Sequence, residues 1–555
     1  AVLSAAALLA IGASMTSFAA AAHWDQQDGE WVYLDRNGDR MTDVWRKSNG
    51  QWYYLDENGY MAREQVIEDD DDKYYVDANG VRVTNAWVSM DNDDLLDDED
   101  ETDSIDTVWM YFGGTGKAVG CDTPNGEIKR LSYGDGQSGY FIFNEDGYML
   151  SGWKKWKKDG SNTDLYYLGT QDQGWAHTGW QYLEVDPDLD AFSGIQEDDE
   201  EFNDQEYFYF NSNGKAVVDD TKSIGGKTYI FDQYGRMLDL WVYPSTGTSS
   251  YTNEKASSAN ATASYFREDN GGREKNWIFA YPNTGYDNYS DDPYWFYLDN
   301  NGRPFRADQT TINLNRLAAI GSSTRINDDD VTDSAAAKYN KAVAAKAIKS
   351  QTYLFNDKGV MLTGLYWLSN VHKGTSASPM TNGYYYFTID GDHSSVEGQM
   401  VTNKRVTIDV QGDDKTYYFK NTGEAHRSAI INSYVYGRNG QLIDAYGDGS
   451  NYQVVEIKDI ALTRQAYVNQ LPADAQTAFN NKYPTSTIAL TDRVLVNKSG
   501  NVEFSSPDND PTTGNAVQVL INENGKIRKS GTVTDVNDQR VTVNNYKVTK
   551  IENRD

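Results

Sequence analysis

The chain has 555 residues, of which 39% are hydrophobic and 24% charged, and its formal net charge is −33. A negative charge of this size argues against nucleic acid and anionic lipid headgroups as partners, because both would be repelled along the whole molecule. Many of the hydrophobic residues are amphipathic aromatics, 40 tyrosines and 14 tryptophans. Such rings can be half buried and still present a face to a ligand. Cations, neutral glycans and basic proteins remain as partners.

The first segment, residues 1–22, contains no charged residue and runs from an apolar stretch into Ser17-Phe18-Ala19 and further alanines. This pattern predicts a secretory signal peptide whose basic n-region is missing. A membrane anchor is the alternative, but an apolar run of ~15 residues is short for one. No later segment approaches the ~20 apolar residues of a spanning helix, so no membrane span is expected.

A repeat dominates the rest of the chain. The glycines Gly38, Gly59 and Gly80 are 21 residues apart, and each follows an aromatic stretch and an Asx residue. The clearest copy reads Trp52-Tyr53-Tyr54-Leu55-Asp56-Glu57-Asn58-Gly59. A period of this length is typical of a solenoid that stacks one small supersecondary unit many times.

Each unit is predicted to be a β-hairpin. The aromatic stretch would form the first strand, Asn58-Gly59 the tight turn, and Tyr60 and Met61 a short second strand. A further tryptophan follows the turn glycine by six or seven residues and is expected in the link between hairpins, as at Trp45, Trp87, Trp153 and Trp241. The predicted fold class is therefore mainly β, a solenoid of aromatic hairpins.

The array is predicted to have interruptions. It would cover residues 23–242, resume as a single repeat at 295–306 and continue over 351–446, with a polar insertion at 243–294 and a loop and helix insertion at 307–350. The helix is expected at 333–349, which is rich in alanine. Residues 447–555 lack the aromatic doublets and are expected to form a small α+β module or a degenerate cap.

Three acidic runs, at 68–72, 91–103 and 197–201, are predicted to be solvated loops that leave the array. Calcium binding is the alternative, but none of them has the spaced ligand set of a calcium loop. Cys121, the only cysteine, excludes an intramolecular disulfide and carries no signature of a nucleophile. The five histidines are scattered without metal-ligand spacing, so no metal or other cofactor is predicted.

The repeated sequence Trp-Tyr-Tyr-Leu-Asp-x-Asn-Gly-x-Met, with its linking tryptophan, resembles the cell-wall-binding repeats of choline-binding proteins, glucan-binding domains and clostridial surface proteins. The resemblance covers roughly residues 24–445, with interruptions. It implies a left-handed β-solenoid in which choline lies between successive hairpins in a cage of aromatic rings. A quaternary ammonium has no hydrogen-bond donor, so cation–π attraction of ~0.5–2 kcal/mol per ring would hold it.

The resemblance implies two groups of cage residues. They are Trp45, Trp52, Tyr54 and Met61, with Trp87 nearby, and Trp153, Tyr166, Tyr167, Trp175 and Trp180. The Gly-Trp dipeptide of choline repeats occurs only in the second group, at Gly152-Trp153, Gly174-Trp175 and Gly179-Trp180. The alternatives are that most of these rings form the core of the array, and that tyrosine faces stack on wall or glucan sugars.

The function predicted from the sequence is an exported, non-catalytic surface protein that attaches without covalent linkage to the envelope of a Gram-positive cell. Its partner would be a choline-bearing teichoic acid, a peptidoglycan glycan or a glucan. An adhesin or toxin-like binder of host glycans is the first alternative. An accessory part of a cell-wall hydrolase is the second, although the segments outside the repeats are short for a catalytic domain.

Overall fold

The computed structural model describes most of the chain as separate segments. These are residues 21–91, 107–121, 123–134, 136–186, 188–193, 195, 205–244, 250–252, 263–282, 292–307, 321–325, 341–369, 371–374, 376, 379–389, 396–410, 413–443 and 451–554. The expected signal peptide, except residues 21–22, and the acidic runs, 197–201 entirely and 91–103 after its first residue, lie outside these segments. The chain divides into two units, residues 1–254 with 266–273 and residues 255–265 with 274–555.

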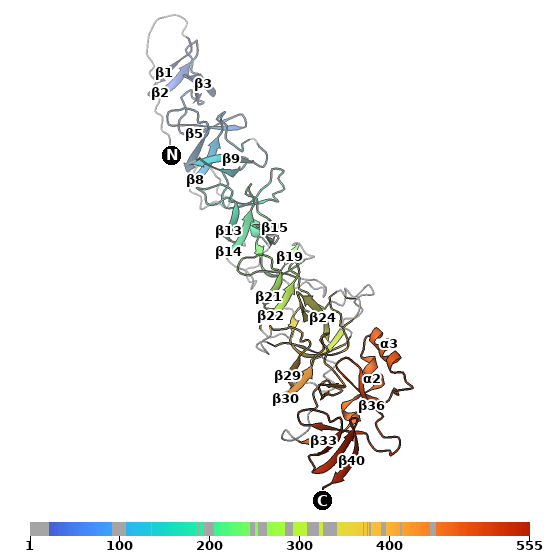
Figure 1. Ribbon diagram of the computed structural model, residues 1–555. Coiled ribbons are helices and arrows are strands. Elements are labelled where there is room, and N and C mark those ends of the chain that lie inside the picture. Colours follow the sequence, from blue (N-terminus) through green and yellow to red (C-terminus); the bar gives the residue numbers. More distant parts are fainter. Residues whose placement is uncertain are drawn as a thin grey trace. The chain divides into compact units, whose positions relative to one another are not determined.

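The first unit is a succession of two-stranded antiparallel hairpins in chain order (Figure 1, blue to green). The hairpins are β1 (His23–Gln27) with β2 (Glu30–Leu34), β3 (Val44–Ser48) with β4 (Gln51–Leu55), β5 (Gln65–Asp69) with β6 (Asp72–Val76), β7 (Ala86–Asp91) with β8 (Thr107–Phe112), β9 (Glu127–Gly134) with β10 (Gln137–Phe143), β11 (Trp153–Lys155) with β12 (Leu165–Tyr167), β13 (Gly179–Glu184) with β14 (Gln205–Phe210), and β15 (Thr221–Ile224) with β16 (Lys227–Phe231). A 3-10 turn (Asp190–Phe192) and the short strands β17 (Met237–Leu238), β18 (Leu240–Pro244) and β19 (Tyr251–Thr252) complete it; β20 (Ser264–Phe266) lies at the boundary of the units.

The second unit continues the hairpins and adds a wider sheet. Hairpins form from β21 (Asn276–Ala280) with β22 (Tyr294–Leu298), β29 (Arg405–Val410) with β30 (Asp413–Tyr418), and β31 (Ala429–Ile431) with β32 (Tyr434–Tyr436). A six-stranded sheet has the order β26 (Met361–Leu362), β25 (Gln351–Asn356), β24 (Lys341–Ile348), β23 (Gly321–Arg325), β27 (Gly364–Ser369) and β28 (Gly383–Phe387). The mainly β prediction is therefore confirmed.

The hairpins are divided differently from the prediction. The aromatic stretch β4 is the second strand of its hairpin, and it pairs with β3, so that Trp45 lies directly opposite Tyr54. The tight turn between them is Asn49-Gly50, in which both residues have positive φ, 48° and 85°, as a type I′ turn requires. The expectation that Trp45 lies in a link between hairpins is wrong, because Trp45 belongs to β3, the strand that precedes the aromatic strand β4 and pairs with it.

The Asx-Gly motif used to find the repeat forms a second turn, which follows the aromatic strand. The Asp56 carboxylate accepts hydrogen bonds from the backbone N–H groups of Asn58, at 2.9 Å, and Tyr60, at 2.8 Å. Gly59 supplies the positive φ of 76°. The same pattern recurs at Asp77, Asn144, Asn211, Asp232, Asp299 and Asn356. An acceptor side chain at this position therefore explains why most units place Asp or Asn there, although Gly113, Lys420 and Gly437 stand at the same position of three other turns.

In many units a backbone hydrogen bond joins a hairpin to the one before it, although the turn of Gly302 has Pro304, which lacks an N–H, at the donor position. The residue two positions after the turn glycine donates its N–H to the first residue of the preceding aromatic stretch, as from Met61 to Trp31 and from Arg82 to Trp52, both at 2.8 Å. Further bonds of this kind run from Ala118 to Lys73, Met149 to Trp109, Ala176 to Tyr140, Ala216 to Leu165, Arg273 to Thr228, Met400 to Thr352, Ala425 to Tyr384 and Leu442 to Thr416. The hairpins are therefore held in one repeated register.

Three of the predicted interruptions are wrong where the structure describes them. Residues 68–72 are the closed end of the hairpin β5–β6, in which Asp69 pairs with Asp72 and Asp70 takes a φ of 54°. The predicted polar insertion at 243–294 contains β21, which forms a hairpin with β22. Residues 333–340 of the predicted helix lie outside the described segments, and residues 341–348 form the strand β24, because pairing with β25 and burial of Val343 and Ala345 outweigh the helix preference of alanine.

The C-terminal segment is a small α+β module, with α1 (Ile457–Ile460), α2 (Arg464–Asn469) and α3 (Ala473–Lys482). Its strands are β33 (Tyr452–Glu456), β34 (Leu462–Thr463), β35 (Arg493–Val496), β36 (Val502–Ser506), β37 (Gln518–Asn522), β38 (Gly531–Thr534), β39 (Gln539–Asn544) and β40 (Lys547–Asn553). The turn after β37 keeps the repeat geometry, and Ile527, two residues after Gly525, donates its N–H to Ser433 at 2.8 Å. The module therefore continues the stack without the aromatic residues.

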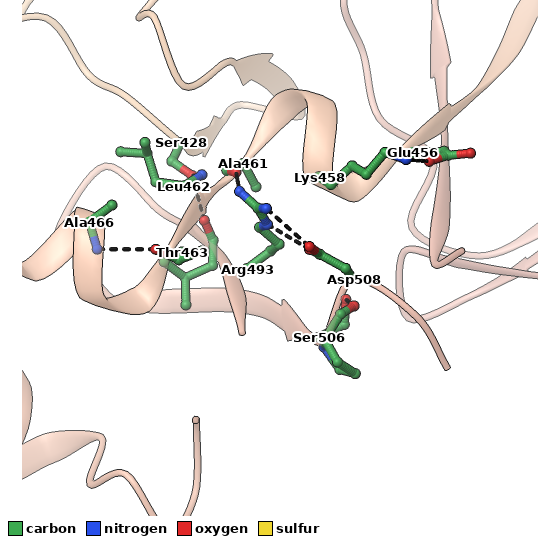
Figure 2. A network of polar contacts seen from close by, with 12 residues as sticks. Ser428, Glu456, Lys458, Ala461, Leu462, Thr463, Ala466, Arg493, Ser506 and Asp508 are labelled. Atoms are coloured by element: carbon green, nitrogen blue, oxygen red, sulfur yellow. Dashed lines mark hydrogen bonds and ion pairs between the residues drawn. The ribbon is translucent and has the colours of Figure 1, made fainter. Parts of the chain in front are cut away.

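A polar network joins this module to the last aromatic hairpin (Figure 2). The hydroxyl of Ser428 donates to the Val494 carbonyl at 2.5 Å and accepts from the Leu462 N–H at 2.8 Å. The Arg493 guanidinium binds both oxygens of Asp508 and also donates to the Ala461 carbonyl at 3.1 Å. Because Ser428 is fully buried, its two hydrogen bonds fix the junction between the array and the module.

Candidate functional site

Rings from two consecutive hairpins surround the guanidinium of Arg82. The Cζ atom of Arg82 lies 5.2 Å from the ring centroid of Trp45, 5.1 Å from that of Trp52 and 5.4 Å from that of Tyr74. Trp45 and Trp52 belong to the hairpin β3–β4, and Tyr74 belongs to β6. The gap between two hairpins is therefore an aromatic cage of the size and chemistry that holds a cation.

Polar contacts of this cage are few. The Arg82 Nε is buried without a hydrogen-bond partner among the described residues, and burial lowers the pKa of the guanidinium. The Trp45 indole N–H donates to the Asp69 carboxylate at 3.0 Å, which fixes the ring from outside the cage. Cation–π attraction to three rings therefore stabilises the Arg82 guanidinium in place of hydrogen bonds.

The repeated register locates the equivalent residues of the other gaps. Each gap has one residue on the first strand of a hairpin, one at the start of the aromatic stretch, one aromatic residue from the next hairpin, and the residue two positions after the turn glycine of that next hairpin. We call such a set a cage where the first three are aromatic. Among the residues that the structure describes, four further cages have methionine in the place of Arg82: Trp24, Trp31, Tyr53 and Met61; Trp87, Trp109, Phe141 and Met149; Trp180, Tyr207, Tyr229 and Met237; and Trp277, Trp295, Tyr353 and Met361.

The ring geometry of these four methionine cages is nearly constant. The leading tryptophan contacts the aromatic residue of the next hairpin with centroid distances of 5.3 Å for Trp24 and Tyr53, 4.8 Å for Trp87 and Phe141, 4.7 Å for Trp180 and Tyr229, and 4.8 Å for Trp277 and Tyr353. Each leading tryptophan is half-buried. These contacts therefore resemble that of Trp45 with Tyr74 beside Arg82, whose ring centroids are 5.2 Å apart.

A carboxylate lies beside the last of these cages. The Glu397 side chain accepts a hydrogen bond from the Trp295 indole N–H at 3.1 Å. Trp295 stands nearly perpendicular to Trp277, with an angle of 88° between their planes. A negative charge at this position favours a cationic ligand in the cage of Trp277 and Trp295.

Other gaps lack a cage. In the gap that follows β11–β12, Phe192 from the 3-10 turn packs edge-on against Trp153 with centroids 4.9 Å apart, and Phe192 has no exposed surface. In the gap that follows β5–β6, Val66 and Lys73 stand where the two tryptophans would be. Aromatic content alone therefore does not identify a cage, because neighbouring side chains can fill the gap.

The structure separates the residues that the resemblance grouped. Trp45 and Trp52 share a cage, with Tyr54 edge-on to Trp45 at 5.1 Å. Met61 belongs to the cage of Trp24, and Trp87 to the cage of Trp109. The first group is therefore distributed over three gaps, because each cage takes its fourth residue from the hairpin that follows.

The second predicted group is divided further. Trp180 belongs to a cage, whereas Trp153 packs on Phe192. Tyr167 contacts Trp153 at 5.0 Å, Tyr166 is buried in the core, and Trp175 is stacked on Tyr133 with centroids 4.4 Å apart. Adjacency in the sequence placed these rings together, but the alternation of the strands and the step between hairpins direct them to different gaps.

The sequence reasoning missed the leading tryptophans Trp24 and Trp277. Trp277 lies six residues after Gly271, a spacing already noted for other tryptophans, but the polar sequence around it concealed the signal. Tyr74 was missed because it belongs to the hairpin after Trp45 and Trp52. The pattern Gly-x-Met, together with the aromatic residues of the preceding unit, marks the sets of Trp24 and Trp277 but not that of Tyr74, which has Arg82 in the place of methionine.

Other candidate chemistry is sparse in the part of the chain that the structure describes. Burial raises the pKa of the Cys121 thiol to about 11, which keeps it protonated and unreactive. Within the described ranges, no group of three or more His, Cys, Asp or Glu side chains is placed to hold a metal ion. Among the helices described, none is long and apolar enough to span a bilayer.

Comparison with curated proteins finds no match for the chain. Among solved structures, the autolysin LytC of Streptococcus pneumoniae is similar at 18% identity and a TM-score of 0.27, over 56% of this chain and 57% of that chain. The chain therefore spans little more than half of that autolysin. Choline-binding protein F of Streptococcus pneumoniae is similar at 14% identity and a TM-score of 0.26, over 77% of this chain and all of that one.

Family models identify the repeats themselves. The model of the choline-binding repeat matches residues 41–87, the segment from β3 to β7 that contains the cage around Arg82. The model of a cell wall binding repeat matches residues 410–425, which include β30 and the turn after it. Residues 41–87 and 410–425 are therefore similar to choline-binding and cell wall binding repeats.

Proposed function

We propose that this protein attaches to a Gram-positive cell wall by holding choline groups of a wall polymer in its methionine cages. The observation that carries the proposal is the repeated set of two aromatic residues from one hairpin, one from the next, and a methionine. A trimethylammonium group offers no hydrogen-bond donor, so it is recognised by ring faces and apolar contact. These are the groups that the cages supply.

Affinity for a polymer would come from the number of cages. One quaternary ammonium in a cage of three rings gains roughly 0.5–2 kcal/mol per ring, which gives weak binding at a single site. A choline-bearing teichoic acid presents many such groups on one chain. Several weak sites on one array then act together, and the second contact is intramolecular once the first is made.

The negative charge of the chain is consistent with a cationic ligand group and with an exported protein at the wall. It disfavours close approach to the phosphates of the same polymer, so that the binding energy is concentrated on the choline groups. No catalytic step is proposed for the chain. Its role is attachment.

A second candidate is binding of wall or host glycans. Tyr182 and Tyr207, which are 53% and 47% exposed, lie on neighbouring strands with their ring centroids 4.5 Å apart. Paired tyrosine faces of this kind also stack on sugar rings. Tyr207 belongs to a methionine cage, so a sugar and a choline group would compete for the same surface.

Co-sedimentation with purified cell walls tests the proposal. The full chain is mixed with walls whose teichoic acid carries choline and with walls grown to carry ethanolamine in its place. Choline attachment predicts retention on the first walls only, and release by free choline. Equal retention on both walls, unaffected by choline, would contradict choline attachment and favour glycan binding.

A further inference from the structure

The cage of Trp45 differs from the four methionine cages in the residue that fills it. In the cage of Trp45, Trp52 and Tyr74, the position taken by methionine elsewhere is Arg82, and its guanidinium lies 5.1–5.4 Å from all three ring centroids. This spacing is the one expected for a cationic ligand over aromatic faces. The chain therefore supplies its own cation to this cage.

The path of the Arg82 side chain shows why methionine would leave the cage open. A carbon atom placed on the turn glycine Gly116 would lie 2.8 Å from Arg82 Nε, and one placed on Gly80 would lie 2.9 Å from Met61 Sδ. Both side chains thus pass beneath the turn of the following unit. Methionine ends one atom beyond that point, whereas arginine carries its guanidinium on into the space between the rings.

The guanidinium is held there by the rings. Its Nε has no hydrogen-bond partner among the described residues, although it is buried. A buried donor without a partner destabilises the folded state, and the attraction of three ring faces offsets this cost. An external cation would have to displace a covalently attached one, whose local concentration is far higher than that of a free ligand.

We propose that Arg82 is an internal ligand that closes a fifth choline site, so that the residue two positions after the turn glycine decides whether a cage is open. This inference rests on the proposed function, because it assumes that the methionine cages take choline. The inference adds that the cage around Arg82, although complete, does not bind choline in the native chain. Substitution of Arg82 by methionine would then create a working site without any other change.

The chain offers a matched control in Arg273. Arg273 also stands two residues after a turn glycine, Gly271, and donates its backbone N–H to Thr228 at 2.8 Å. Its gap has Thr221 and Thr228 where the cage residues would be, and its Nη2 bonds to the Thr228 hydroxyl at 3.2 Å. Arg273→Met therefore removes the same charge at the same repeat position without opening a cage.

The number of choline sites in the full chain is measured by equilibrium dialysis with radiolabelled choline. We expect Arg82→Met to gain one site over the native chain, and Arg82→Lys and Arg273→Met to keep the native number. An unchanged number in folded Arg82→Met would overturn the inference. A native chain that binds no choline at all would instead contradict the proposed function, so the two failures are distinguishable.

A second measurement on the native chain covers the case in which Arg82→Met does not fold. The Nε–Hε correlation of Arg82 is assigned by its loss in Arg82→Lys, and ring currents should shift its proton strongly upfield. Saturation with choline should move the indole signals of cage tryptophans such as Trp24 and leave the Arg82 signal in place. Movement of the Arg82 signal to an exposed position would show displacement by choline and overturn the inference.

Discussion

Phe192 stands edge-on against Trp153, with ring centroids 4.9 Å apart and an angle of 84° between the ring planes. Phe192 comes from a 3-10 turn between β13 and β14, outside the regular hairpins, and it has no exposed surface. Phe192 therefore fills the gap beside Trp153, the tryptophan of a Gly-Trp dipeptide, and makes it part of the core. Phe192→Ala should lower the free energy of unfolding by about 3–5 kcal/mol, because it leaves a cavity beneath Trp153.

Chemical denaturation followed by tryptophan fluorescence measures this loss. Leu189→Ala, in the same segment but with a side chain that is 39% exposed, is the control and should change stability little. Equal effects of the two substitutions would contradict the buried position of Phe192.

Truncation of Trp180 and of Trp153 should have different effects, although each is the tryptophan of a Gly-Trp dipeptide. Trp180→Ala removes one ring of a methionine cage and should weaken that site roughly twofold to thirtyfold, which corresponds to ~0.5–2 kcal/mol. Trp153→Ala should lower stability and leave the number of choline sites unchanged. Choline titrations of both variants by calorimetry check this, and loss of a site in Trp153→Ala would refute the assignment of its gap as core.

Gly80 should tolerate a methyl group less well than Gly38. Both have positive φ, 74° and 89°, so alanine at either position carries a strain of about 1–2 kcal/mol. A methyl group on Gly80 would also lie 2.9 Å from Met61 Sδ and 3.0 Å from the Ala62 carbonyl, whereas one on Gly38 meets no atom within 4 Å. Gly80→Ala should therefore be the less stable variant in thermal unfolding, and should also weaken choline binding at the cage of Trp24 and Met61.

His426 should make stability depend on pH below neutrality. Burial, with the positive charges of Lys420 and Lys498, lowers the pKa of this histidine from 6.5 to about 3. The unfolded chain therefore takes up a proton that the folded chain excludes, so stability is full above pH 6.5 and is lost as the pH falls toward 3. The slope from this one group is at most about 1.4 kcal/mol per pH unit.

Substitution isolates this contribution from that of the many carboxylates. Urea unfolding between pH 6.5 and pH 4 should show a shallower slope for His426→Gln than for the native chain. His23→Gln, at the exposed start of β1, should keep the native slope. Parallel curves for all three proteins would show that His426 is protonated in the folded state as well.

The local parts of the fold could be predicted from the sequence, because their causes are local. The turn of Asp56 and Gly59 needs an acceptor side chain and a positive φ, and both are visible in the residues themselves. The pairing of strands was assigned wrongly because Asn49-Gly50 and Asn58-Gly59 are equally good candidates for a tight turn. Only the register of Trp45 opposite Tyr54 decides between them.

The cages could not be predicted residue by residue, because each is assembled from separate segments of two hairpins. Trp295 and Tyr353, for example, are joined only through the step from one hairpin to the next. Arg82 resembles any solvated arginine in the sequence, and its place among three rings depends on the same step. Alanine-rich residues 341–348 followed strand pairing instead of local preference, which shows again that tertiary contacts decided what composition could not.

The step between hairpins is made by main-chain atoms, as in the bond from the Arg82 N–H to the Trp52 carbonyl. Any residue except proline can stand at the donor end of such a bond, so a hairpin can be duplicated, lost or moved in the gene without redesign of its neighbours. An array built in this way can change its number of open sites through single substitutions at one position, and its reach through unequal recombination. Avidity and length can therefore evolve independently.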